Sequence, residues 1–403
     1  MAENILKPQI RFKGFTEAWE QRKAKGLFNS TADKGYPELP VLSATQDRGM
    51  IRRDENSINI FHDKKNESGY KRVLPGQFVI HLRSFQGGFA HSTIEGITSP
   101  AYTVFGFSEP EKHDSEYWKY VFTSKEFIRR LETVTYGIRD GRSISYDEFL
   151  TLDFVYPSKA EQTTIARYLV ELSILITLHQ RKCEKLQDLK KGLLEKMFPA
   201  DGSDKPQIRF KGFTEAWEQR KLGDIASIVG GGTPSTINND YWGGSINWFS
   251  PVEIGNEIYV SSSQNKITKE GYDNCSAKLL PVGTILFTSR AGIGKTAILT
   301  VKGCTNQGFQ SIVPNIDKLD SYFIYSRSDE LKKYGEAMGA GSTFVEVSGK
   351  QMAEMKLMMP STLKEQQVIG NFFKNLDNLI TLHQRKCEKL KNLKKALLEK
   401  MFA

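Results

Sequence analysis

The sequence predicts an α+β protein with a pseudo-two-fold internal repeat, in which two similar mixed domains are each followed by a long helix. Three observations predict this fold class. Two segments occur twice, the later one carries a helical pattern of apolar residues, and the regions between the repeats hold short strand-like runs. A chain of 403 residues is long enough for two domains that each bury a core.

The repeats divide the chain. PQIRFKGFTEAWEQRK stands at residues 8–23 and, unchanged, at 206–221, and we call each copy the opening segment. The second repeat covers 176–198 and 380–402, where 23 residues differ only at Gln187/Lys391, Asp188/Asn392 and Gly192/Ala396. Pro, Gly and Asp between the halves predict a linker. The expected organisation is a first domain at 1–157, a helix at 158–198, the linker at 199–205, a second domain at 206–360 and a helix at 361–403.

Each tail predicts a long helix with one apolar seam. Ser158 with Glu161, and Thr362 with Glu365, have the spacing of a capping box directly after a proline. Apolar residues then recur at alternating steps of three and four, as in a coiled coil, so we expect the two helices to pack on each other. About 40 residues would give a rod of roughly 60 Å. The seam residues are Ile165, Leu169, Leu172, Ile176, Leu186 and Leu193 in the first tail, and Ile369, Phe373, Leu376, Ile380, Leu390 and Leu397 in the second.

The bodies between the repeats predict compact α+β domains. Strand-like runs stand at 77–83, 101–107, 284–290 and 309–314, and helical stretches stand at 115–132 and 319–338. Residues 76–98 align with 283–305 without a gap through seven shared positions. We therefore expect one fold in both bodies, with different surfaces.

Composition argues against several classes of protein. No apolar run reaches the roughly 18 residues of a membrane span, and the first residues lack a secretion signal, so we expect a cytoplasmic protein. The four cysteines form no CxxC pair, which argues against a disulfide framework and against zinc. His179, Cys183 and their copies His383 and Cys387 lie on the helical seam, where packing is expected and no metal site.

No motif nominates a catalytic residue. AGIGKT at 291–296 resembles a phosphate loop, but Ser289 occupies the position of its first glycine, and a β-turn is expected instead. The [DN]-P-P-[FY] loop of amino-methyltransferases is absent from the sequence. A nuclease-like set of Asp317, Glu330 and Lys332 is too common by chance to carry a prediction.

Polar side chains on glycine-rich turns point to nucleic-acid recognition. Arginine suits bidentate contact with guanine, and Ser and Thr contact phosphates and bases. A solvated loop side chain is the alternative at each position. The candidates are Arg83, Ser84, Gln86, Arg139, Arg142 and Ser143 in the first body, and Ser289, Arg290, Lys295, Ser342 and Thr343 in the second.

On these features the chain resembles the specificity (S) subunits of type I restriction-modification systems. The resemblance covers the whole chain and rests on GFTEAWEQRKLGDI at 212–225, on Glu161-Gln162 and Glu365-Gln366 at the helix starts, and on the LLEKMF endings. The first half departs from this pattern at residues 24–28, AKGLF, which leaves the start of its first strand in question.

The resemblance implies two target-recognition domains, each reading one half of a split, asymmetric sequence in double-stranded DNA. The helices would form an antiparallel coiled coil that spaces the domains and docks two modification (M) subunits. Those subunits would bind S-adenosylmethionine and methylate adenine, while restriction (R) subunits would use ATP with Mg²⁺. This chain would be non-catalytic and bind no cofactor. A single-chain restriction-modification enzyme and a coiled-coil scaffold without a nucleic-acid role are the alternatives.

The net charge of +9 lies mainly on the predicted helices. Residues 1–157 carry +1 and 199–360 carry 0, whereas 158–198 carry +3 and 361–403 carry +5. Any DNA-binding face of the domains must therefore come from local clustering. We expect the basic helices, through Lys190, Lys191, Lys394 and Lys395, to meet either DNA over the spacer or an acidic face of a partner.

Overall fold

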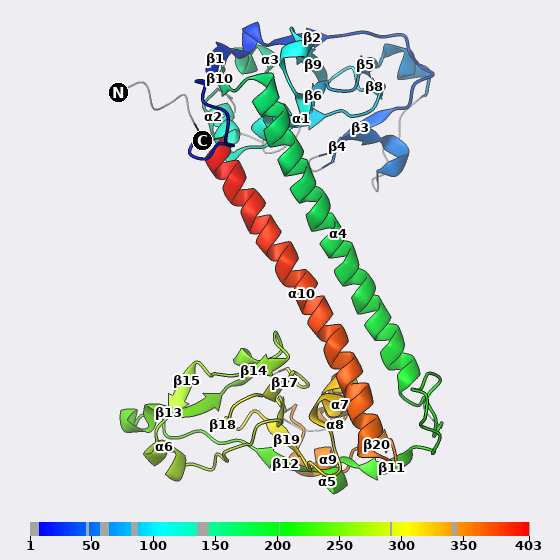
Figure 1. Ribbon diagram of the computed structural model, residues 1–403, viewed down its shortest axis with the longest axis vertical. Helices are drawn as coiled ribbons and strands as arrows, with labels where there is room; N and C mark the ends of the chain where they lie inside the picture. The colour runs from blue at the N-terminus through cyan, green and yellow to red at the C-terminus, as the bar shows by residue number, and fades with distance from the viewer. Residues whose placement is uncertain are drawn as a thin grey trace. The chain divides into compact units, whose positions relative to one another are not determined.

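The computed structural model describes residues 8–45, 48–56, 64–81, 88–134, 145–200, 202–290, 292–340 and 345–402. The chain forms two compact units (Figure 1). Unit 1 comprises Met1–Gln180 and Arg385–Ala403, and unit 2 comprises Arg181–Gln384. Each unit therefore contains one half of the first long helix and one half of the second.

Unit 1 is built on an antiparallel sheet in the order β2-β9-β6-β7. Its core is largely aromatic, with Phe28, Phe105 and Trp118 fully buried. The sheet strands are β2 (Phe28–Thr31), β6 (Phe78–Ile80), β7 (Phe89–His91) and β9 (Thr103–Phe107); two further pairs join β3 (Leu42–Thr45) to β4 (Gly49–Arg52) and β5 (Lys71–Val73) to β8 (Gly96–Thr98). The helices are α1 (Ser115–Phe122), α2 (Lys125–Val134) and α3 (Tyr146–Phe149).

Unit 2 has a mixed sheet in the order β12-β19-β16-β17-β14 and a smaller sheet in the order β15-β13-β18. Phe287, Phe309 and Phe323 are fully buried between these layers and the helices. The strands are β12 (Ala226–Gly230), β13 (Trp242–Phe249), β14 (Tyr259–Val260), β15 (Asn265–Ile267), β16 (Ile285–Phe287), β17 (Thr296–Leu299), β18 (Gly303–Thr305) and β19 (Gln310–Pro314). The helices are α5 (Leu222–Ile225), α6 (Lys269–Asp273), α7 (Ser321–Ser326), α8 (Ser328–Gly339) and α9 (Gly349–Ala353).

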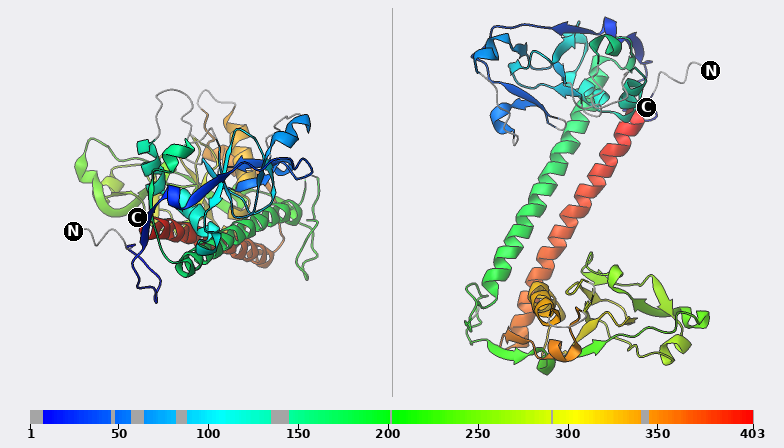
Figure 2. Two further views of the ribbon diagram at one scale, coloured as in Figure 1. Left: turned by 90° about the horizontal axis from the view of Figure 1, so that it is seen from above. Right: turned by 180° about the vertical axis from the view of Figure 1, so that it is seen from behind.

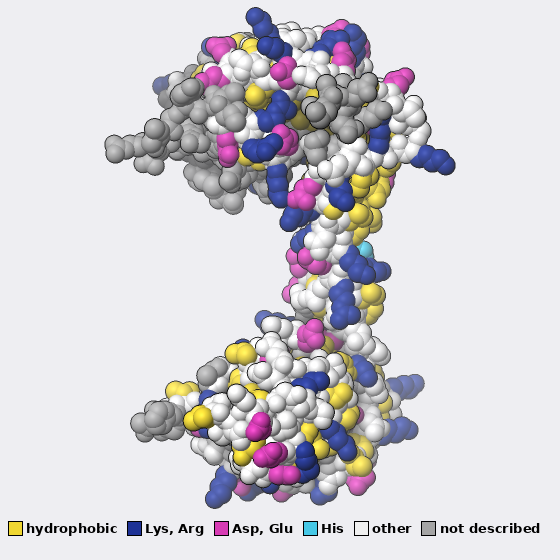
Figure 3. Space-filling view, turned by 90° about the vertical axis from the view of Figure 1, so that its left-hand side faces the viewer, with side chains coloured by type: hydrophobic (Ala, Val, Ile, Leu, Met, Phe, Trp, Pro, Cys, Tyr) yellow, Lys and Arg dark blue, Asp and Glu magenta, His cyan; other side chains and the backbone are white. Residues whose placement is uncertain are grey.

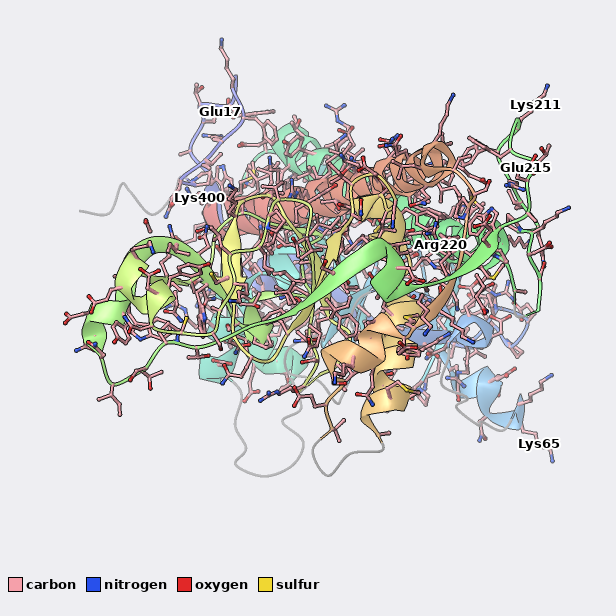
Figure 4. The ribbon with its side chains drawn as sticks, turned by 90° about the horizontal axis from the view of Figure 1, so that it is seen from below. Glu17, Lys65, Lys211, Glu215, Arg220 and Lys400 are labelled. Atoms are coloured by element: carbon pink, nitrogen blue, oxygen red, sulfur yellow. The ribbon has the colours of Figure 1, made fainter. Side chains whose placement is uncertain are left out.

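Each opening segment ends in a strand, and this strand makes an equivalent antiparallel pair in each unit. In unit 1, β1 (Glu20–Lys23) pairs antiparallel with β10 (Asp153–Tyr156), and in unit 2, β11 (Glu218–Lys221) pairs with β20 (Lys356–Met359). The departure at residues 24–28 therefore leaves the first strand intact. Lys211 and Glu215 stand on the exposed loop that precedes β11 (Figure 4).

The two long helices, α4 (Lys159–Met197) and α10 (Leu363–Met401), run antiparallel (Figures 1 and 2). In unit 1 the Lys394 amine donates to Ser173 Oγ at 2.8 Å, and in unit 2 the Lys190 amine contacts the Asp377 carboxylate at 2.7 and 2.9 Å. All twelve predicted seam residues are buried or half-buried. The predicted packing of the two helices is confirmed.

The opening segments explain why the flanks of the two halves are nearly identical. Arg11 binds both oxygens of Glu161 at 2.7 Å, and Arg209 binds Glu365 at 2.7 and 2.8 Å. The backbone N–H of Ile208 reaches Lys196 O at 2.9 Å, and that of Gln9 reaches Lys400 O at 3.0 Å. Each opening segment thus ties the start of one long helix to the end of the other, so both copies must fit the same partners. The contacts join Arg11, Glu161 and Lys400 in unit 1, and Arg209, Glu365 and Lys196 in unit 2.

Two expectations were wrong in detail. The Glu161 and Glu365 carboxylates do not close capping boxes, because Arg11 and Arg209 bind them. The helical stretch at 115–132 is broken at Thr123–Ser124, and the stretch at 319–338 is broken at Arg327. Ser124 forms the N-cap of α2 by accepting a hydrogen bond from Phe127 N at 3.1 Å, which ends one helix and starts the next.

Candidate nucleic-acid interface

The turn between β16 and β17 in unit 2 is held in one shape by Thr288. Its hydroxyl donates to Gly292 O at 2.7 Å and accepts from Lys295 N at 2.9 Å. Gly292 and Gly294 have φ of 102° and 93°, and a Cβ on Gly294 would stand 2.3 Å from the Lys332 side chain. The described residues 292–295 form a turn, as the sequence predicts, and because strand β17 starts at Thr296, no helix begins where a phosphate loop would need one.

Three further segments contact this turn, and a fourth, residues 231–233, packs on one of them through Gly232 N, which donates to Thr305 O at 2.9 Å. Ser289 N donates to Gly308 O at 2.8 Å, and Arg290 pairs with Glu346 at 2.9 Å. A Cβ on Gly255 would lie 3.1 Å from the Lys295 side chain, so the stem of this lysine lies along that glycine. We call the resulting surface, residues 231–233, 250–255, 288–295, 305–308 and 345–347, the loop face of unit 2; Ala291 lies outside the described residues.

Three sequence candidates fall on the described part of this face. Arg290 and Lys295 are exposed, whereas Ser289 is fully buried. The Ser289 hydroxyl cannot reach a ligand from this position. Arg290 and Lys295 therefore remain the candidate DNA contacts among these three residues. The other candidates lie outside the described residues; they are Arg83, Ser84, Gln86, Arg139, Arg142, Ser143, Ser342 and Thr343.

Sequence reasoning missed Thr233 and Gln307 on the loop face. The Thr233 hydroxyl donates to Gln307 Oε1, and the Gln307 side chain is exposed. The preceding glycines permit this approach, because a Cβ on Gly231 would stand 1.9 Å from Asn306 O. The glycine run at 230–232 was the available signal, since repeated glycine often marks a close approach of two backbones.

Unit 1 keeps the frame of this turn. His81 N donates to Gly88 O at 3.0 Å, and at the positions 207 residues later Thr288 N donates to Lys295 O at 3.0 Å. Gly76 and Gly283 share a φ of 87°. At these described positions, the segments 76–98 and 283–305 therefore share the same backbone hydrogen bond and the same glycine conformation.

A second surface lies on the long helices. In unit 1, Leu175, Leu178 and Leu393 remain 44%, 56% and 41% exposed. In unit 2, the residues shifted by 204 positions, Leu379, Leu382 and Leu189, remain 47%, 45% and 51% exposed. Basic and hydrophobic side chains both appear along the helices in Figure 3. Both units thus leave a matched set of leucines outside the seam.

Burial shifts the pKa of several titratable side chains. Burial lowers the pKa of His91 and of His113 in unit 1 to about 4, and it raises the pKa of the Cys304 thiol in unit 2 to about 12. Across the described part of the chain, no group of three His, Cys, Asp or Glu side chains could hold a metal ion. Within the same residues, no helix is both long and apolar enough to cross a membrane.

Comparison with known proteins points to one family. Residues 214–392 match the family described as "Type I restriction modification DNA specificity domain". The chain is 36% identical over 189 residues to the type I restriction enzyme MjaIX specificity subunit of Methanocaldococcus jannaschii, a match that covers 46% of this chain and 44% of that one. It is 24% identical to a protein named as the MjaX specificity subunit of the same organism, over 98% of this chain and 95% of that one.

The fold has a solved counterpart. The S subunit of a type I restriction-modification system from M. genitalium has a TM-score of 0.63 and 15% identity, with 98% of this chain and 99% of that chain covered. This likeness confirms the predicted α+β fold of two β-rich domains with two long antiparallel helices.

These features define a duplicated α+β recognition protein with one frame and two different loop surfaces. The chain is similar to the specificity subunits of type I restriction-modification systems, the family that its sequence resembles, through the matched residues 214–392 and over nearly its whole length.

Proposed function

We propose that this chain is the DNA sequence-recognition subunit of a type I restriction-modification complex. Each domain reads one half of a bipartite, asymmetric site in double-stranded DNA, and the two helices space the domains and dock two modification subunits. The observation that carries this proposal is the contrast within the repeat. The contacts Arg11–Glu161 and Arg209–Glu365 are the same in both halves, whereas the loop-bearing bodies differ. Such a frame suits two copies of one partner and two different half-sites.

Lys295 and Gln307 are the proposed contacts of the second domain. Lys295 is exposed on a rigid turn and has no ion-pair partner among the described residues, which suits a phosphate oxygen. The Gln307 amide is of the type that binds adenine on two atoms in the major groove. Arg290 is already paired with Glu346, so its contact requires exchange of that partner.

Catalysis and cofactors are proposed to belong to other subunits. The modification subunits bind S-adenosylmethionine and methylate adenine, the restriction subunits use ATP with Mg²⁺, and the complex works in the cytoplasm. The exposed leucines on α4 and α10 support the docking role, because apolar side chains outside a seam favour burial against a partner.

The proposal is tested by DNA binding of the chain in complex with its modification subunit. Methylated adenines mapped in cells that carry the complex would supply the site. Lys295→Ala is expected to weaken binding by about fivefold at low salt and to reduce the salt slope by about one. Lys302→Ala is the matched control, because Lys302 is exposed beyond the other end of β17 and removes the same charge.

Half-site specificity is tested through the first domain. Arg139→Ala and Arg142→Ala are expected to lose discrimination at one half-site only, and Gln307→Ala at the other. Equal loss when either half of the DNA is altered would contradict the division of labour. Methylation or cleavage by the purified chain alone would favour the single-chain enzyme, and no sequence-dependent affinity with the modification subunit would favour the scaffold.

A further inference from the structure

Unit 1 contains a cleft of about 680 Å³ beside the last turns of α10. The start of α2 and the middle of α4 form its other walls. Half-buried Ile176, Leu398 and Phe402 form an apolar floor. Lys391, Lys394 and Lys395 lie around it. The cleft thus combines an apolar floor with a basic rim.

Short residues at one helix junction leave the cleft open. Thr123 and Ser124 join α1 to α2 and line the cleft, whereas Arg327 alone joins α7 to α8 in unit 2. Arg327 is 6% exposed, and its guanidinium lies 5.3 Å from the ring of Phe198. Phe198 is the repeat equivalent of Phe402. A buried arginine therefore stands against this phenylalanine in unit 2, whereas in unit 1 Phe402 contacts the ring of Tyr117 at 5.3 Å and lines the cleft.

The acidic residues of the cleft are already paired. Glu399 binds Lys125 at 2.6 Å, and Glu126 binds Arg129 at 2.8 Å. Lys391 and Lys395 are exposed, and neither forms a salt bridge in the part of the chain that the structure describes, although Lys395 lies near enough to Glu399 to help Lys125 lower the pKa of that carboxyl. The rim therefore offers unpaired positive charge.

The two halves differ at one position of this rim. Lys391 corresponds to Gln187, one of only three differences in the repeated 23 residues. Lys394 corresponds to Lys190, but the Asp377 carboxylate binds Lys190 in unit 2, whereas Lys394 donates to the Ser173 hydroxyl and lies 5.3 Å from the Tyr120 ring. The equivalent face of unit 2 is therefore less basic.

We propose that the cleft of unit 1 receives an acidic amphipathic helix of a modification subunit, so that the two modification subunits of one complex bind with unequal affinity. This inference rests on the function proposed above. Carboxylates on the helix would face Lys391 and Lys395, and an apolar side chain would cover Phe402. A DNA backbone would satisfy the lysines but has no apolar side chain for the floor, which is why a protein helix is favoured.

The experiment is a titration of the full-length chain with its modification subunit, followed by calorimetry and native mass spectrometry at about 0.1 and 0.5 M NaCl. Two binding steps are expected at low salt, and the tighter one should weaken at high salt. Lys391→Gln copies the other half and should weaken the tighter step about fivefold at low salt and little at high salt. Gln187→Lys is the reciprocal control and should leave the tighter step unchanged.

A second variant tests the shape of the cleft. Thr123 is exposed, so Thr123→Arg can place an arginine beside Phe402 without disturbing the core, and it should weaken the tighter step at both salt concentrations. Two binding steps of equal affinity that neither variant changes would overturn the inference and leave the proposed function unaffected. An effect of Lys391→Gln on DNA affinity alone would also overturn it, by assigning the rim to DNA. No binding of the modification subunit would refute the proposed function itself.

Discussion

At the scale of single residues, the two halves place different partners opposite the same lysine. Lys190 contacts Asp377, which is 6% exposed and also accepts from the Tyr322 hydroxyl at 2.8 Å. Lys394 contacts Ser173 instead, and burial, with a smaller contribution from Lys119, lowers the pKa of Lys394. This lysine contact between the helices is therefore charge-paired in unit 2, whereas in unit 1 it is a hydrogen bond to a neutral hydroxyl.

Asp377→Ala is expected to destabilise the protein by about 2 to 3 kcal/mol, because it leaves Lys190 and Tyr322 without their acceptor in a largely buried place. Ser173→Ala, the matched change in unit 1, removes one neutral acceptor and should cost about 1 kcal/mol. Urea unfolding followed by circular dichroism measures both. Equal midpoints for the two variants would contradict the difference between the units.

Two buried histidines make unit 1 sensitive to acid. The pKa of His91 and of His113 is about 4 in the folded protein, chiefly through burial, against about 6.5 when unfolded. Between pH 6.5 and pH 4 the unfolded chain binds more protons, so stability should fall as the pH falls through this window and level off below it. His113→Phe should reduce the loss, because the ring stacks on Phe107 and its Nδ1 has no partner among the described residues. Urea midpoints at pH 7 and 5 test this, and an unchanged difference between them would contradict it.

At the scale of elements, the opening segments act as clamps on the long helices. Glu365 is 1% exposed and accepts from Arg209 and from Trp217 Nε1 at 3.3 Å, whereas the equivalent Trp19 Nε1 has no partner among the described residues. Glu365→Gln should therefore loosen its segment more than Glu161→Gln does, by about 2 against about 1.5 kcal/mol. Faster tryptic cleavage at exposed Lys211 reports the loosening by Glu365→Gln, and cleavage at the equivalent exposed Lys13 reports that by Glu161→Gln. Glu215→Gln, on the same exposed loop, is the control and should cleave at the wild-type rate.

The same elements show what sequence could and could not predict. The seam of α4 and α10 was predictable because helical spacing alone selects Leu169 and Phe373 for burial. Ser158 and Glu161 have the spacing of a capping box, yet Arg11, 150 residues away, binds the carboxylate. Local patterns cannot rank a distant partner against a near one, so that contact was missed.

The loop face was harder to predict for the same reason. Ser289 sits in a polar, glycine-rich stretch typical of an exposed turn, but its backbone binds Gly308 and its side chain is buried. Thr233 and Gln307 come together from segments 74 residues apart. Arg290 and Lys295 are predictions from residue type alone, whereas the pairing of Thr233 with Gln307 could not be predicted because only the fold brings these segments together.

At the scale of the whole molecule, the structure divides the four lysines that concentrate the charge on the helices. Lys190 and Lys394 point to the opposite helix, whereas Lys191 and Lys395 are exposed. A single prediction for all four would therefore mix two roles, one in helix packing and one at the surface.

Reversing the charge of Lys191 and Lys395 together should weaken assembly with the modification subunit or flatten the salt dependence of DNA binding, and leave the urea midpoint unchanged. Reversing Lys190 and Lys394 should instead lower the urea midpoint, because a glutamate at 190 would face the Asp377 carboxylate. The Lys190 and Lys394 variant is the control for lost helix packing, so an effect of the Lys191 and Lys395 variant without loss of stability is assigned to the surface. If the Lys191 and Lys395 variant assembles normally and keeps the wild-type salt slope, the excess charge of the helices serves neither the partner nor DNA.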